Sequence, residues 1–144
     1  EQHMDFDLEL AKSESKDNPV YYIQYAHARI CTLIRKLANK DMAWDSNMGL
    51  EQLELLGEAT EIALMQQIEL YPEVIAQAAK NHEPHQVEHY TKDLAGNFHS
   101  YYNAYRMVID DAQLRNARMC LCMAARQVID NGLGLLGVDA PEQM

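Results

Sequence analysis

The sequence has 144 residues, a formal net charge of −10 and a hydrophobic content of 48%. This length suits one domain with a sizeable core, and the apolar content excludes an intrinsically disordered chain. No apolar run reaches the roughly 20 residues of a membrane span, and no secretory signal pattern opens the chain, so we expect a soluble, cytoplasmic protein without a membrane partner.

Negative charge is concentrated in the middle of the chain. Residues 41–96 include eleven acidic and two basic residues, whereas residues 1–40 include six of each and residues 97–144 include five acidic and four basic residues. Residues 19–40 contain four basic residues and no acid. Nucleic-acid binding generally rests on basic surfaces. We therefore expect any anionic partner to meet the two ends of the sequence and to avoid its middle.

The first half of the chain is predicted to be helical, because apolar residues recur three and four positions apart. A short helix is predicted at residues 5–13. Asn18 and Pro19 are typical of a helix cap and first helical position, and that helix should run to about Asn39. Its apolar stripe consists of Ile23, Ala26, Ile30, Leu33 and Leu37. A third helix is predicted at about Leu50–Leu70, with a core side of Leu56, Ala59, Ala63 and Leu70 and with Glu51, Glu54, Glu58 and Glu61 on its remaining faces.

Pro72 should break that helix and begin a shorter piece to about Lys80. A long helix follows from Pro84 to about Arg106, with a core stripe of Val87, Tyr90, Leu94, Phe98, Tyr101 and Tyr105. The last helix begins after Asp111 and ends near Leu136, where Gly137 is a natural stop. No segment alternates as a strand does. The predicted class is all-α, an irregular bundle of about five main helices.

The helix at residues 19–39 has the clearest candidate site. Tyr22, Tyr25, Arg29 and Lys36 fall within about 60° of one another on a helical wheel, beside the core stripe. Tyrosine offers a flat face to an unstacked base, and arginine offers planar donors to phosphate or to a base edge. Interleaved aromatic and basic side chains are typical of surfaces that bind single-stranded RNA. On this pattern alone, tyrosines at the rim of the core beside a solvated arginine are the simpler interpretation.

Two later helices repeat this pattern more weakly. His99, Tyr102 and Arg106 share one side of their helix, which alone is more typical of a solvated flank. Three arginines share one side of the last helix: Arg115, Arg118 and Arg126. They form either a basic patch or an ordinary surface, and the pattern leaves both interpretations open.

The sequence offers no clear catalytic or metal site. His85 and His89 are spaced as zinc ligands on a helix, and with Glu88 they match a metalloprotease pattern. A third ligand and a catalytic scaffold are missing, so exposed histidines are the simpler interpretation. The sequence has three cysteines and no Cys-x-x-Cys pair: Cys31, Cys120 and Cys122. This favours buried thiols over a disulfide framework or a zinc site. We predict no metal and no catalytic residue in this chain.

Three long segments resemble one known family, in the family's own order. The first is Asn18 to Ile30, the second is Phe98 to Arg106, and the third is Ala125 to Val138 followed by Pro141 to Met144. Together they are similar to the C-terminal anticodon-binding domain of bacterial-type arginyl-tRNA synthetases. The signature of the wider DALR domain family appears loosely at Asp111–Arg115.

The resemblance implies a function that composition alone does not. Family members are class I synthetases that use ATP and Mg²⁺ to join arginine to tRNA-Arg, and their catalytic body lies upstream of this domain. We expect residues 1–17 to connect to that body and residues 18–144 to form the anticodon-binding domain. The chain itself should be a monomer that binds tRNA-Arg, carries no cofactor and does not turn over.

The family's anticodon contacts carry over to six positions, which are Tyr22, Tyr25, Arg29, Tyr105, Ile109 and Met144. Lys36, Tyr102, Arg106 and Arg126 complete the predicted nucleic-acid-binding set. Placing Tyr105 in this set conflicts with placing it in a core stripe. Gln143 departs from the family, whose tail usually has a basic residue there. A metal-dependent hydrolase and a helical protein-interaction domain are the alternative functions.

Overall fold

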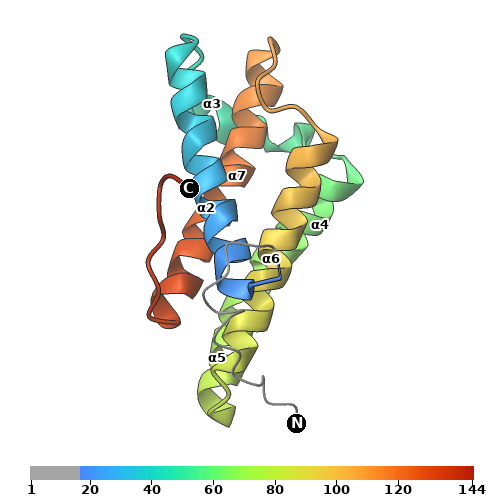
Figure 1. Ribbon diagram of the computed structural model, residues 1–144. Helices are drawn as coiled ribbons and strands as arrows, with labels where there is room; N and C mark the ends of the chain where they lie inside the picture. Colours follow the sequence, from blue (N-terminus) through green and yellow to red (C-terminus); the bar gives the residue numbers. More distant parts are fainter. Residues whose placement is uncertain (1–16) are drawn as a thin grey trace.

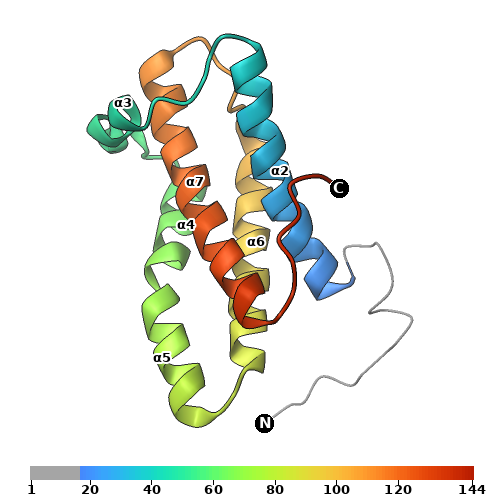
Figure 2. The same cartoon turned by 90° about the vertical axis from the view of Figure 1, so that its left-hand side faces the viewer.

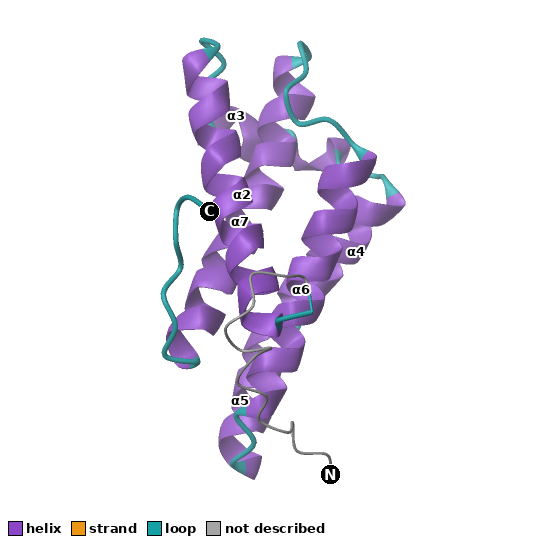
Figure 3. Ribbon diagram, viewed as in Figure 1, coloured by secondary structure: helices purple, strands orange, loops and turns teal. Residues whose placement is uncertain are grey.

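The described part of the chain is built from helices and connecting turns alone. The computed structural model describes residues 17–144, and it has no strand in that range (Figure 3). The helix predicted at residues 5–13 lies outside the described residues. The elements are α2 (Pro19–Asn39), α3 (Ser46–Glu51), the 3₁₀ turn η1 (Leu53–Leu55), α4 (Ala59–Glu69), α5 (Tyr71–Asn81), α6 (His85–Ala104) and α7 (Ala112–Leu135). The prediction of an all-α bundle is confirmed.

Helix α2 begins and ends where its sequence predicts. The Asn18 side chain accepts hydrogen bonds from the backbone N–H groups of Val20 (3.1 Å) and Tyr21 (3.4 Å), and Pro19 occupies the first turn. These contacts satisfy donors that a helix start leaves without partners. All five residues of the predicted stripe are buried, and α2 packs them against α6 and α7.

The continuous helix predicted at Leu50–Leu70 is wrong. The chain instead forms α3, η1 and α4, and a new helix begins at Ala59 because Glu58 and Glu61 make a capping box. Helix α3 packs on α7 so closely that a Cβ on Gly49 would lie 2.3 Å from the Asn116 carbonyl oxygen. Ala59, Ala63 and Leu70 are exposed, whereas Leu64 and Glu61 are buried.

Helix α6 packs against four other helices, α2, α4, α5 and α7 (Figures 1 and 2). The ends of α2 and α6 and the turn that leads into α7 lie at the same end of the bundle, at the top of both views. This arrangement brings two distant, aromatic and basic parts of the sequence together.

Helix α7 ends at Leu135, and the chain then reverses its direction. Gly137 has a positive φ of 73°, and the Val138 N–H donates to the Leu133 carbonyl oxygen at 2.9 Å, which closes the helix end. The tail that follows runs back beside α2 (Figure 2). None of the helices within residues 17–144 combines the length and apolar content that crossing a membrane requires.

Candidate nucleic-acid interface

Four aromatic rings and one guanidinium group form a continuous stack between α2 and α6. We call this stack of Tyr21, Tyr25, His99, Arg29 and Tyr102 the aromatic shelf. The rings of Tyr21 and Tyr25 are nearly parallel with centroids 6.4 Å apart, and the His99 ring stacks on Tyr25 at 5.4 Å. The Arg29 guanidinium carbon lies 5.1 Å from the Tyr25 centroid and 4.1 Å from the Tyr102 centroid. Such cation–π contacts attract the positive charge to the ring faces.

Two hollows adjoin each other along this side of the bundle. The shelf hollow has a volume of about 320 Å³ and is lined by Tyr21, Tyr22, Tyr25, Arg29, His99 and Asn103. The end hollow has a volume of about 540 Å³, shares Asn103 with it, and is lined by Leu33, Lys36, Lys40 and residues 102–108. Among the described residues, no Asp or Glu lines either hollow. An acidic protein thus has a local surface with four cations: Arg29, Lys36, Lys40 and Arg106.

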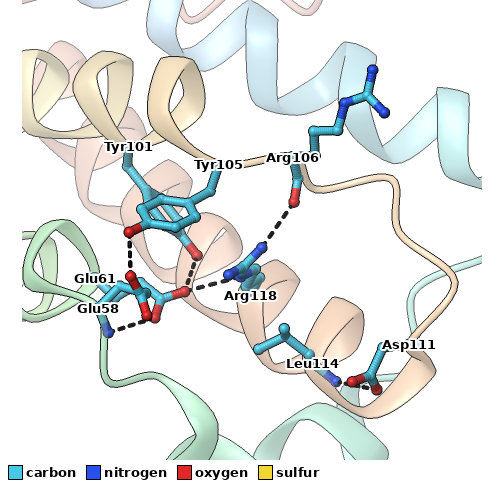
Figure 4. A network of polar contacts seen from close by, with 8 residues as sticks. All are labelled: Glu58, Glu61, Tyr101, Tyr105, Arg106, Asp111, Leu114 and Arg118. Atoms are coloured by element: carbon cyan, nitrogen blue, oxygen red, sulfur yellow. Dashed lines mark hydrogen bonds and ion pairs between the residues drawn. The ribbon is translucent and has the colours of Figure 1, made fainter.

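The turn that borders the end hollow is fixed by two arginines of α7. Arg118 Nη1 donates to the Arg106 carbonyl oxygen at 3.0 Å, and Arg115 Nη1 donates to the Ile109 carbonyl oxygen at 2.8 Å. The side chain of Arg106 extends away from these contacts (Figure 4). Its guanidinium is therefore available to the hollow while its backbone is held.

A buried carboxylate anchors Arg118. Glu61 is 0% exposed, accepts a hydrogen bond from the Tyr101 hydroxyl at 2.6 Å, and accepts one from Arg118 Nε at 3.0 Å (Figure 4). Burial raises the pKa of Tyr101 well above its usual range, and the hydrogen bond to Glu61 raises it further. The hydroxyl therefore remains a donor. The buried pair joins α4 to α7 directly beneath the turn.

Tyr105 belongs to the same network of contacts, and its side chain is half-buried. Its hydroxyl donates to Glu58, and Arg118 lies 5.0 Å from the centroid of its ring (Figure 4). The hydrogen bond to Glu58 raises the pKa of Tyr105. Tyr105 packs on the core and also lines the end hollow, so its placements in a core stripe and in a binding site are compatible.

Two of the three arginines on the last helix, for which the sequence left a basic patch or an ordinary surface open, do not lie on the surface. Arg115 and Arg118 are each only 8% exposed, because they bind the turn and Glu61. Arg126 is half-buried and donates to Cys31 Sγ at 3.6 Å. It lines a separate hollow beside the tail, with His27 and Glu142 among its neighbours.

Side chains of α2 hold the C-terminal tail by its backbone. Gln24 Nε2 donates to the Asp139 carbonyl oxygen at 2.8 Å. His27 Nδ1 lies 2.9 Å from the Pro141 carbonyl oxygen. Arg35 Nη2 donates to the Glu142 carbonyl oxygen at 3.0 Å. Met144 follows with 51% of its surface exposed. The tail therefore ends beside α2, on the helix that carries Arg29 and Lys36.

The structure brings together most of the residues predicted for nucleic-acid binding. Tyr22, Tyr25, Arg29, Lys36, Tyr102, Tyr105 and Arg106 line the two hollows or belong to the aromatic shelf. Ile109, Arg126 and Met144 do not line either hollow. Lys40 and Asn103 were missed, although Lys40 belongs to a basic run without acids. His99 was assigned to a solvated flank, which is wrong because it is 7% exposed between the two helices.

The histidines considered for zinc remain separate from this site. The rings of His85 and His89 contact each other with centroids 6.0 Å apart, and His85 Nε2 lies 3.6 Å from Glu83. Within residues 17–144 there is no group of three or more candidate ligands arranged to hold a metal ion. Cys31, Cys120 and Cys122 are buried, as predicted from their helical positions.

A family model described as the DALR anticodon binding domain matches residues 23–144. The chain belongs to this family. Over its whole length, the DALR domain is 57% identical to the arginine–tRNA ligase of Legionella pneumophila strain Corby and 56% identical to that of Coxiella burnetii strain RSA 331. It spans only about a quarter of the length of these curated relatives (25% in each case).

Two solved structures share the fold of the DALR domain. A putative arginyl-tRNA synthetase from Campylobacter jejuni gives a TM-score of 0.84 at 27% identity, over 99% of this chain and 30% of that one. The Thermus thermophilus arginyl-tRNA synthetase gives 0.79 at 29% identity, over 99% of this chain and 24% of that one. The predicted family is confirmed.

The loosely matched DALR signature has a structural role in this domain. The Asp111 side chain accepts from the Leu114 N–H at 3.2 Å and so caps α7. Arg115, four residues after Asp111, binds the carbonyl oxygens of Ile109 and Asp110. The signature thus starts α7 and ties the preceding turn to it, which shapes one wall of the end hollow.

Proposed function

We propose that this DALR domain binds the anticodon stem and loop of arginine tRNAs, as the anticodon-reading part of a cytoplasmic arginine–tRNA ligase. The observation that carries this proposal is the pair of adjoining hollows, which offer aromatic faces and four cations without a carboxylate. ATP and Mg²⁺ belong to the catalytic body of such a ligase, and none of the residues described above is assigned to them. We further propose that the domain acts as a monomer, that residues 18–144 form it, and that residues 1–17 connect it to the catalytic body.

Binding follows from the chemistry of an unstacked loop. Bases that leave the stack can lie on aromatic faces, and Tyr25 offers one because it is 39% exposed. Arg29 lies over the rings of Tyr25 and Tyr102, and its planar N–H groups can donate to phosphate or to a base edge. Lys36, Lys40 and Arg106 supply charge for the neighbouring phosphates. The protein as a whole is acidic, with a net charge of −10, so the attraction to RNA is confined to these cations. Because salt screens contacts between cations and phosphates, binding should weaken steeply as the salt concentration rises.

The middle anticodon base offers a fixed target. Every arginine codon has G at its middle position, so each matching anticodon has C there. A splayed cytosine presents an N4 amine that needs an acceptor, beside acceptors at N3 and O2. Within the described residues, the carbonyl oxygens of Tyr102, Asn103 and Ala104 accept no hydrogen bond, as is usual at a helix end. These residues line the end hollow, so we assign the N4 amine to these carbonyls.

The tail is a second element of the proposed reader. It is held on α2 and leads to Met144, whose exposed side chain could close the pocket around the base. Gln143 cannot supply the charge that the usual basic residue of the family would supply. Deleting residues 138–144 should weaken RNA binding and leave the helices folded, as measured by circular dichroism. Unchanged affinity would exclude the tail from the site.

The decisive experiment compares two RNA hairpins at low salt. Fluorescence anisotropy would measure the affinity of the 144-residue chain for an arginine anticodon stem-loop and for the same hairpin with middle C changed to U. We expect the C hairpin to bind more tightly. Tyr25→Ala and Arg29→Ala should each weaken its binding by about tenfold, since stacking on an aromatic side chain contributes roughly 1–3 kcal/mol per base.

Lys92→Ala is the matched control for the loss of one positive charge, because Lys92 is exposed on α6 and lines neither hollow. It should change the affinity little. Equal affinity for the C and U hairpins would mean that the domain binds the RNA by electrostatic attraction alone and does not read the middle base. Absence of binding, or equal effects of Lys92→Ala and Arg29→Ala, would overturn the proposed function.

A further inference from the structure

A buried histidine bonds to the central arginine of the aromatic shelf. His99 Nδ1 lies 3.0 Å from Arg29 Nη1, and His99 Nε2 lies 3.4 Å from the Tyr22 carbonyl oxygen. A guanidinium group only donates hydrogen bonds, so Nδ1 must be the acceptor. The carbonyl only accepts, so the ring proton belongs on Nε2. Both contacts are satisfied together by one neutral tautomer of His99.

This hydrogen bond completes the immobilisation of Arg29. The rings of Tyr25 and Tyr102 each lie against the guanidinium group. His99 adds a hydrogen bond from one edge and so sets the direction in which the remaining donors point. Arginine has five N–H donors, and the remaining ones stay available for a ligand. A side chain that is already ordered loses less conformational entropy when it binds.

We propose that His99 is a positioning residue, which in its neutral form holds Arg29 flat on the aromatic shelf for contact with RNA and releases it when the ring is protonated. This inference rests on the proposed function. Protonation would place a hydrogen on Nδ1, remove the acceptor and bring two cations together. RNA binding should therefore lose the contribution of Arg29 as the pH falls.

The surroundings of His99 favour its neutral form. Burial lowers the pKa of His99 and the charge of Arg29 lowers it further, while the hydrogen bond to the Tyr22 backbone raises it. Among the described residues, the titratable and charged groups in contact with the ring are on α2: Arg29, Tyr22 and Tyr25. Within residues 17–144, no carboxylate contacts the ring to stabilise an imidazolium ion. The arginine is therefore held at neutral pH and is released on the acidic side of 6.5.

The first test needs no RNA. Long-range ¹H–¹⁵N NMR of the 144-residue chain should report a His99 ring protonated at Nε2 alone at pH 7.5. Arg29→Met should raise the pKa of His99, because it removes the neighbouring charge. A ring protonated at Nδ1, or a pKa that Arg29→Met leaves unchanged, would overturn the proposal.

The second test measures affinity for the arginine stem-loop between pH 5.5 and 8. His99→Phe keeps a ring but has no acceptor, and it should weaken binding by about tenfold at pH 7.5, as expected for losing a hydrogen bond to a charged group. His99→Asn keeps an acceptor close to the position of Nδ1 and cannot be protonated. It should retain most of the affinity and remove the loss of binding that the unmodified chain shows below pH 6.5.

The two tests separate two kinds of failure. If His99→Phe binds as tightly as the unmodified chain while Arg29→Ala still weakens binding, His99 has no positioning role but the proposed function stands. If the unmodified chain binds no stem-loop, the proposed function fails, and the NMR tautomer still decides whether His99 holds Arg29. A His99→Asn variant that keeps the full pH dependence would also overturn the role of His99.

Discussion

Replacing Arg118 by methionine tests how strongly the buried network supports the fold. Arg118 donates to Glu61 and to the Arg106 carbonyl, and it covers the ring of Tyr105. Methionine keeps much of the apolar stem but leaves the carboxylate of Glu61 completely buried, with the Tyr101 hydroxyl and the Glu58 backbone N–H as its remaining donors. Removing one partner of a buried ion pair costs about 3–5 kcal/mol. The free energy of unfolding should fall by that amount, which corresponds to a midpoint lower by roughly 10 °C.

Urea titration followed by circular dichroism would measure this loss. The double variant Glu61→Gln, Arg118→Met removes both charges and keeps an acceptor for Tyr101, so it should recover at least about 2 kcal/mol relative to Arg118→Met. Lys92→Met likewise replaces a cationic side chain by methionine, at an exposed position, and should stay within about 0.5 kcal/mol of the unmodified chain. A loss below about 1 kcal/mol for Arg118→Met, or strict additivity in the double variant, would refute the network as a support of the fold.

Three further predictions concern packing and titration. Gly49→Ala should lower the free energy of unfolding by about 1–3 kcal/mol in chemical denaturation, because its Cβ would meet the Asn116 backbone, whereas Gly57→Ala has open space and should not. Burial raises the pKa of Cys122 to about 12, so a thiol-specific reagent at pH 8 should modify it only at the rate at which the protein unfolds, and fast labelling of the native state would contradict this. Burial, together with Tyr71, raises the pKa of Tyr90 to about 12. Since the unfolded chain loses this proton first, near pH 10, stability should fall between pH 10 and 12, and Tyr90→Phe should reduce that fall.

Local signals in the sequence account for much of the bundle. Asn18 and Pro19 fix the start of α2, and its apolar stripe identifies the side that is buried. The predicted ends of α6 and α7 agree with the structure within two residues because proline, aspartate and glycine mark them. The break between α3 and α4 was missed, although Gly57 and the pair Glu58 and Glu61 are local signals of a new helix start.

Contacts between distant residues explain the other errors. Glu61 seemed to be a surface acid, because its partner Arg118 lies 57 positions further along the chain. Arg115 and Arg118 share a helix side with Arg126, and periodicity alone cannot show which of these cations the fold covers. His99 was likewise misassigned because its partner Arg29 lies 70 positions away. Tyr25, Arg29 and Tyr102 of the aromatic shelf could thus be named from helical spacing and family resemblance, whereas Tyr21 and the contact between His99 and Arg29 could not.

The C-terminal tail is held through its main chain, and this has a practical consequence. Gln24, His27 and Arg35 all bind carbonyl oxygens of the tail, which every amino acid possesses. Side chains at positions 139 and 142 can therefore be exchanged while the same three anchors persist. A fluorophore-bearing residue installed there would report directly on a hairpin arriving at α2, with the docked path of the tail intact.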